Sequence, residues 1–179
     1  MTVLNRAVVA DDDGAEVKFS ISENCEASSI YTSVADVFGV GKTVMVQKIT
    51  LSTLVDMLPV DGQIVVKLDI EGAELDVLEK IPGECLRRIH QLTVEFHDNL
   101  DPRMGPRVQG IIQSLRSQGF VVLKGDAPGN DDVLFLNAAS SPWWERFPGV
   151  AAARVLLCTR GLLRALLVTA RTNCLQKRA

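Results

Sequence analysis

The chain has 179 residues, a formal net charge of -3 at pH 7, and a composition of 47% hydrophobic and 23% charged residues. These are ordinary globular values in a chain long enough to bury the core of one domain, so they exclude collagen-like and disordered classes. The acidic balance gives no reason to expect a nucleic-acid partner.

Cysteine usage and the first residues bear on the compartment. The four cysteines lie far apart and form no C-x-x-C pair, so we expect reduced, mostly buried thiols, with a zinc site or a disulfide as the weaker interpretation. The N-terminus lacks the basic and long apolar regions of a signal peptide. We therefore expect a cytoplasmic protein.

The first elements predict a hairpin beside a loop. Residues 4–10 and 16–22 favour strands, and the turn Asp11-Asp12-Asp13-Gly14 lies between them. The three aspartates lack the spacing and the closing glutamate of a calcium loop, so turn chemistry is the preferred interpretation. Residues 22–41, which include Tyr31, are expected to form a loop over a site.

Residues 43–50 predict a strand, and residues 51–58 predict a helix capped by Ser52. The clearest pattern follows in residues 63–81, QIVVKLDIEGAELDVLEKI. An apolar strand ends there in acids and a glycine and passes directly into a helix, as parallel strands do in α/β proteins.

The period of two along this strand places Val65, Lys67 and Asp69 on one face. We expect this face to be mostly buried, so that the charge of Lys67 is paired with Asp69 or Glu95. Past the strand end, Glu74 is expected to be a solvated helix residue.

Residues 91–96 predict a second apolar strand, with Thr93, Glu95 and His97 on one face. If the two strands are parallel neighbours, Lys67, Asp69, Glu95 and His97 converge at the carboxyl edge of one sheet, where ligands of open α/β sheets bind.

His97 could act there as general base toward an acceptor hydroxyl, with Glu95 or Asp98 orienting it. The alternative is a structural, hydrogen-bonded histidine. A divalent metal is a weaker alternative, since no ligand spacing such as H-x-x-x-H is present, and we assign no metal site.

The later elements complete an α/β domain over residues 1–140. Residues 106–118 predict a helix, and residues 120–124 and 132–137 predict two strands joined by a short turn, hence an antiparallel pair. We predict a mostly parallel sheet with a C-terminal antiparallel hairpin.

The tail, residues 141–179, has a different character. If it is helical, its arginines fall within a narrow arc and its leucines spread over the rest, which predicts a basic, strongly apolar helix. Arginines interrupt each apolar run, so it cannot easily span a bilayer. Residues 150–179 could contact an anionic membrane surface peripherally, bind a protein partner, or cover an apolar face of the domain itself.

The segments LNRAVVADDDGAEVKFSI, VVKLDIEGAELDVLEKI and LTVEFHD together resemble the C-terminal two thirds of an FkbM-type methyltransferase domain. The K-x-D-x-E-G-x-E pattern is the most specific part. The resemblance covers roughly residues 4–137. It implies a partial Rossmann-like class I methyltransferase sheet, with S-adenosylmethionine as methyl donor to the hydroxyl of a small hydroxylated or sugar acceptor.

The resemblance implies that Asp69 and Glu71 lie beside the methyl donor or the acceptor. From this and the residue pattern we assign catalytic roles to Asp69, Glu95 and His97, cofactor binding to Asp69, Glu71 and Gly72, and substrate binding to Lys67, Glu71 and His97. The alternatives are that the acids cap the following helix, that the glycine only permits the tight turn, and that the lysine forms a structural ion pair.

The pattern departs from the family at its start. A strand, a glycine-rich turn of G-x-G-x-G type and a helix normally bind the cofactor, and no such segment precedes residue 4. We therefore expect a truncated domain. The alternative function is a non-catalytic module that binds a partner or forms a homodimer through an uncovered sheet edge.

Overall fold

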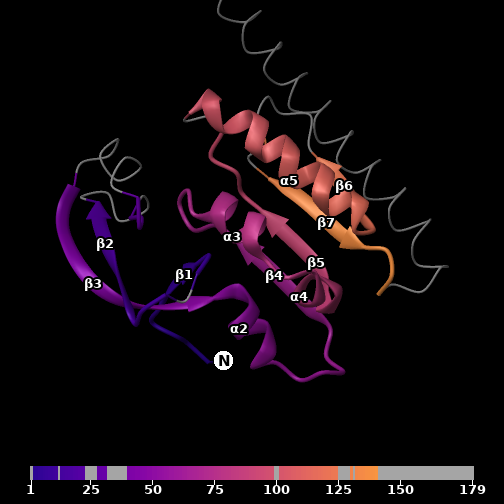
Figure 1. The fold of residues 1–179 in the computed structure, drawn as a ribbon, viewed down its shortest axis with the longest axis horizontal. Helices are drawn as coiled ribbons and strands as arrows, with labels where there is room; N and C mark the ends of the chain where they lie inside the picture. The colour runs from indigo at the N-terminus through magenta and orange to yellow at the C-terminus, as the bar shows by residue number, and fades with distance from the viewer. Residues whose placement is uncertain are drawn as a thin grey trace, which may run out of the picture.

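The computed structural model describes residues 2–11, 13–22, 28–31, 40–98, 101–124, 130 and 132–140. They form two small sheets and several helices, so the α/β class is confirmed (Figure 1). The first sheet has the order β1-β3-β2. Its strands are β1 (Ala7–Val9), β2 (Glu16–Ser22) and β3 (Val40–Thr50).

The second sheet has the order β4-β5-β7-β6. Its strands are β4 (Ile64–Leu68), β5 (Ile89–Val94), β6 (Phe120–Lys124) and β7 (Val133–Asn137). The helices are α2 (Leu51–Asp56), α3 (Glu74–Lys80), α4 (Gly83–Arg88) and α5 (Gly105–Ser117), with a short 3-10 turn, η2 (Pro102–Met104).

Strand pairing confirms part of the predicted sheet and corrects the rest. β4 and β5 are parallel neighbours, and β6 and β7 form the predicted antiparallel pair. The sheet is not mostly parallel, because β7 inserts antiparallel between β5 and β6. The predicted hairpin of β1 and β2 is wrong: each pairs with β3, β1 in parallel and β2 antiparallel. A long third strand supplied both with a partner that the turn signal alone could not reveal.

Local helix signals were also only partly correct. Thr50, not Ser52, caps α2, since its side chain accepts a hydrogen bond from the amide of Thr53. Helix α4 was not predicted, because Pro82-Gly83 stops α3 and then starts a new helix at once.

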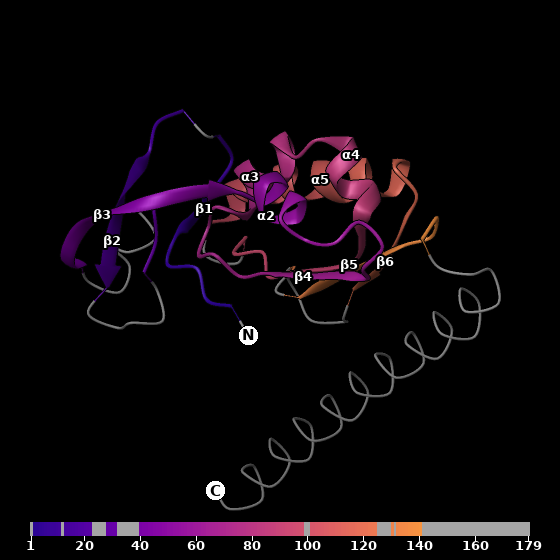
Figure 2. The ribbon, with the colours of Figure 1, turned by 90° about the horizontal axis from the view of Figure 1, so that it is seen from below.

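The core lies between the four-stranded sheet and the helices that cover one of its faces. Figure 2 shows α2, α3, α4 and α5 on the same side of this sheet. Ile89, Leu92 and Val94 of β5 are fully buried there, and Val108, Ile112 and Leu115 of α5 pack into the same cluster. Helix α5 repeats apolar residues at helical spacing, which explains why its sequence predicted it well.

The opposite face of β4 was predicted to be mostly buried, and that prediction is wrong. Val65 is 64% exposed, and Lys67 and Asp69 on the same face are exposed as well. Within the described residues the helices lie over the other face only, so β4 alternates between a covered and an open side.

The tail, residues 141–179, lies outside the described residues, as do Cys25, Cys158 and Cys174. Cys85 is buried and free, as expected, and burial raises the pKa of its thiol to about 11. In the part of the chain that the structure describes, no helix is long and apolar enough to cross a membrane.

The core assignment predicts different costs for two valines of neighbouring strands. Val94→Ala removes two methyl groups from a fully buried site and should lower the free energy of unfolding by about 2–3 kcal/mol. Val65→Ala, the matched control on the open face, should change it by less than about 0.5 kcal/mol. Urea unfolding measures both, and equal losses would contradict the placement of the core.

Candidate active site

The carboxyl ends of β4 and β5 lie side by side. Leu68 pairs with Val94 in register, and the carbonyl of Leu68 accepts a hydrogen bond from the amide of Glu95 at 3.0 Å. The side chains that follow the two strands therefore meet, as the period-two pattern predicted. One ligand atom from each of Asp69, Glu95 and His97 lies within 4.8 Å of the other two.

Lys67 supplies the positive charge on the open side of this edge. Its Nζ lies 2.9 Å from a carboxylate oxygen of Asp69 and 3.6 Å from one of Glu95. The predicted pairing is correct, but it is not buried, since the lysine side chain is 59% exposed. The hydrogen bond to Asp69 raises the pKa of Lys67, and burial raises the pKa of Glu95.

Three oxygen and nitrogen ligands in this range could hold a divalent cation. The ammonium group of Lys67 already bridges the two carboxylates, however. One ammonium group faces two carboxylates, so Lys67 offsets part of the negative charge of the cluster.

The turn that joins β4 to α3 has an uncommon backbone. Glu71 has a φ of 54°, the one positive φ at a non-glycine residue in the described chain, and Gly72 follows with a φ of 100°. The left-handed conformation costs a residue with a Cβ roughly 1–2 kcal/mol. Ser29, which is fully buried, stabilises it by donating a hydrogen bond from Oγ to the carbonyl of Glu71 at 2.6 Å.

Glu74 holds the same turn from the other side. It is 1% exposed, and its two carboxylate oxygens accept hydrogen bonds from the amides of Ile70 at 2.7 Å and Gly72 at 2.9 Å. The prediction that Glu74 is a solvated helix residue is therefore wrong. The alternative role of Asp69 and Glu71 as caps of the helix is not seen, because the cap residue of α3 is Ala73, without a side-chain cap hydrogen bond.

His97 faces these two glutamates. Its Nε2 lies 3.4 Å from a carboxylate oxygen of Glu71, and its Nδ1 lies 3.7 Å from one of Glu74. Nδ1 is buried and has no closer partner among the described residues. The interaction with Glu74 raises the pKa of His97, while burial raises the pKa of Glu71.

The groups expected to orient His97 differ from those that do so. Glu95 lies near it without forming a hydrogen bond or an ion pair with it, and Asp98 instead accepts hydrogen bonds from the backbone and side-chain amides of Asn130. Asn130 in turn accepts a hydrogen bond from the amide of Phe96 at 3.2 Å, which fixes the segment after β5. Glu71 and Glu74 are the carboxylates that face the imidazole.

The edge thus contains two charge clusters with different environments. The outer one, Lys67, Asp69 and Glu95, is largely exposed and is therefore screened by solvent. The inner one, Glu71, Glu74 and His97, is mostly buried, so the charges of its groups interact more strongly. A neutral imidazole in this position can accept a proton from a bound hydroxyl. The two carboxylates beside it then stabilise the positive charge that it gains.

Comparison with known proteins identifies a family for the chain. The family model described as the methyltransferase FkbM domain matches residues 5–122, a span that contains β4, α3, β5 and every residue of both clusters. No curated protein and no solved structure matches the chain.

The inner cluster predicts a cost for Glu74→Gln. The glutamine amide would face one of the two backbone amides, so a buried donor would lose its acceptor and the free energy of unfolding should fall by about 1–3 kcal/mol. Glu79→Gln is the control on the same helix, where an exposed pair with Arg107 is worth less than about 1 kcal/mol.

The pH dependence gives this prediction a second measurement. A raised pKa of His97 means that its charge stabilises the fold fully below about pH 6.5 and that this contribution disappears as the pH rises through the folded-state pKa. Glu74→Gln should therefore lower the pKa of His97, which NMR titration of the imidazole reports, and should cost more stability near pH 6 than at higher pH. An unchanged His97 titration would contradict the pairing.

Proposed function

Because the chain belongs to the methyltransferase FkbM domain family, we propose that it is an S-adenosylmethionine-dependent methyltransferase that methylates a hydroxyl of a small hydroxylated or sugar acceptor. The observation that carries the proposal is the position of the inner cluster. His97, Glu71 and Glu74 lie at the carboxyl edge of two parallel strands within the matched residues.

The sheet order supports the proposal. Two parallel strands followed by a closing antiparallel hairpin, β4-β5-β7-β6, fit the second half of a class I methyltransferase sheet. In this interpretation β4 is an inner strand of the family fold. The edge of β4 that is free in the described sheet is then the edge that pairs with the first half of the sheet in the family fold.

The donor set at the turn fits part of the cofactor. S-adenosylmethionine, when bound, supplies a methyl group on a positively charged sulfur. The carboxylates of Asp69 and Glu71 suit its cationic groups, and Gly72, with a φ of 100°, permits the tight turn that positions them. The glycine-rich turn that would hold the rest of the cofactor is not present among the described residues, in which Gly41 belongs to β3.

The chain's own residues provide the proton chemistry. His97 would take the proton from the acceptor hydroxyl, and Glu71 and Glu74 would stabilise the imidazolium that forms. Lys67 would orient the acceptor from the open side, since its ammonium group is accessible. The imidazole must be neutral to accept a proton, so transfer should fall as the pH drops below its raised pKa.

The two histidines allow a matched test. His97→Asn removes the base and should lower methyl transfer from radiolabelled cofactor to a hydroxylated acceptor by about 100-fold or more. His90→Asn is the control, because the one side-chain hydrogen bond of His90 among the described residues is accepted by Nδ1 from the amide of Ile64, and an asparagine oxygen can take that place. We expect His90→Asn to keep the activity.

Calorimetry with S-adenosylmethionine and S-adenosylhomocysteine separates binding from transfer. Both histidine variants should bind the cofactor as the unchanged protein does. Binding of neither compound would refute catalysis by this chain, and equal activity in the two variants would refute the role of His97.

A partner-binding module is the second candidate function, and one observation favours it. In the described sheet β4 pairs with β5 alone, so its other edge has free backbone amides and carbonyls, next to the exposed Val65. Unpaired, apolar strand edges promote association through strand pairing. A homodimer built on this edge is the simplest such assembly.

Light scattering over a range of concentrations tests this candidate. A homodimer should become monomeric in Val65→Lys, which places a charge on the edge strand next to Lys67. Val60→Lys is the control, since Val60 is 84% exposed but lies outside the sheet. A monomer at all concentrations would remove the candidate.

A further inference from the structure

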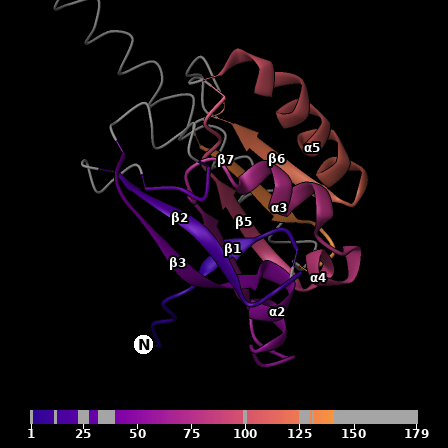
Figure 3. The same ribbon diagram turned by 60° about the vertical axis from the view of Figure 1, so that its left-hand side comes forward.

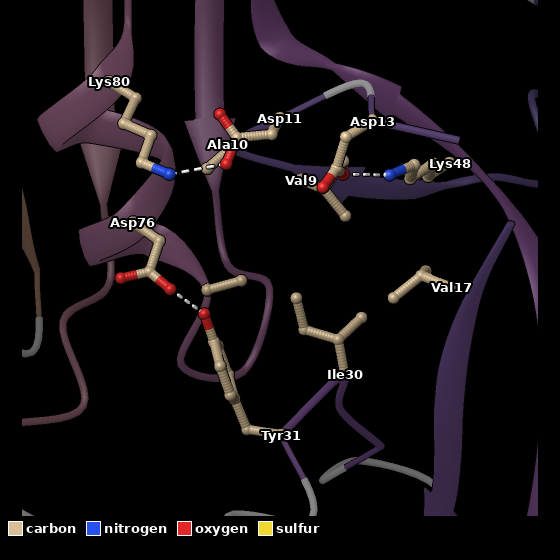
Figure 4. Close-up of a pocket in the computed structure, with 11 residues that line it drawn as sticks. Val9, Ala10, Asp11, Asp13, Val17, Ile30, Tyr31, Lys48, Asp76 and Lys80 are labelled. Carbon is tan, nitrogen blue, oxygen red and sulfur yellow. Dashed lines mark hydrogen bonds and ion pairs between the residues drawn. The ribbon is translucent and has the colours of Figure 1, made fainter. Parts of the chain in front are cut away.

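A cavity of about 200 Å³ lies between β1, β3 and α3, separate from the two charge clusters. Figure 3 shows the three-stranded sheet beside α3, and Figure 4 shows the side chains that surround the cavity. Its apolar wall comprises Val9, Ala10, Val17, Ile30 and Ala73. Its polar rim comprises Asp11, Asp13, Tyr31, Lys48, Asp76 and Lys80.

The size of the cavity limits its ligand. The cavity of about 200 Å³ admits only small ligands. It is smaller than the ~300–1,000 Å³ of sites that hold drug-sized ligands. A single ring with its substituents fits this space, whereas a whole nucleoside-containing cofactor does not.

Lys48 is the group that points to a ligand. Its side chain is 7% exposed, and its Nζ donates to Asp13 at 2.7 Å, its one hydrogen-bond partner among the described residues. An ammonium group has three N–H donors, and a buried donor without an acceptor is costly. Asp13 itself is 87% exposed, so the ammonium group lies at the rim of the cavity, where its two remaining donors can bond to oxygen atoms of a ligand or of water.

The charges of the rim determine which kind of oxygen atom a ligand can offer to Lys48. Lys48 is paired with Asp13, Lys80 with Asp11, and the hydroxyl of Tyr31 bonds to Asp76 (Figure 4). The three carboxylates face two ammonium groups, and Asp76 is also paired with Arg107 at 2.6 Å, so the described rim has no surplus positive charge for an anion. Hydroxyl groups suit such a rim, because each can accept from an ammonium group and donate to a carboxylate.

We propose that this cavity binds a neutral, hydroxyl-rich ring of the size of one monosaccharide. Its hydroxyl oxygens accept hydrogen bonds from Lys48 and its hydroxyl protons are donated to the rim carboxylates, while its carbon face packs on the apolar wall. This binding depends on the lining of the cavity and not on the proposed function.

Saturation-transfer NMR on the full chain, without cofactor, tests the proposal with methyl hexopyranosides, a hexose phosphate and a hexosamine. The neutral glycosides should bind. Lys48→Met should weaken their binding about ten-fold or more, because it removes the ammonium donors at nearly constant volume. Ala10→Leu should abolish binding by filling the cavity, and Ala138→Leu, at a partly buried position after β7, is its control.

Each outcome decides the inference. Any one of three results would overturn it. These are no saturation transfer to any neutral glycoside, tighter binding of the hexose phosphate than of the glycosides, and unchanged glycoside binding in a folded Lys48→Met protein. His97→Asn should leave glycoside binding intact, so failure of the proposed methyl transfer and failure of this inference are distinguishable. Circular dichroism establishes that each variant is folded.

Discussion

One buried carboxylate holds together the turn on which the candidate site depends. The first amides of a helix lack partners inside it, and α3 starts at Ala73 without a side-chain cap. Glu74 turns back instead and accepts hydrogen bonds from the amides of Ile70 and Gly72. Its negative charge also lies where the helix dipole favours it. The same carboxylate faces His97, so the stability of the turn and the charge of the imidazole depend on one side chain.

The two clusters differ in burial, and therefore in how strongly their charges interact. Solvent screens the pairs of Lys67, so their contribution is small and depends on salt. His97 and Glu71 are only 14% and 23% exposed in their side chains, so their mutual interaction is weakened less. The strained backbone of Glu71 keeps its carboxylate on the histidine, and Ser29 stabilises that backbone from β2's side of the molecule.

The sequence predicted what depends on periodicity along one strand or helix. The convergence of Asp69, Glu95 and His97 followed from two strands with period two that end in polar residues. What depends on a third partner could not be predicted in this way. The burial of a strand face depends on where the helices pack, so the predicted burial of Lys67 was wrong. The hairpin failed for the same reason, because β3 pairs with both β1 and β2.

Glu74 was missed although the sequence contained a signal for it. A glutamate in the first turn of a helix, directly after a glycine turn, is placed to bond the free amides before it. The local pattern does not distinguish this role from solvation, because both put an acid at the start of a helix. Only the packing of β5 beside the turn, which brings His97 to the carboxylate, decides between them. Ser29 left no local signal, since its bond to Glu71 spans 42 positions.

The helix α3 connects the site and the cavity physically. Residues two apart on a helix point to nearly opposite sides, so Glu74 faces the strand ends while Asp76 faces the cavity. The segment opposite repeats this division: the hydroxyl of Tyr31 bonds to Asp76, and its amide donates to Ser29 Oγ at 3.0 Å. Ser29 then donates to the carbonyl of Glu71. Residues 29–31 therefore contact both the rim of the cavity, through Tyr31, and the turn that carries Glu71, through Ser29.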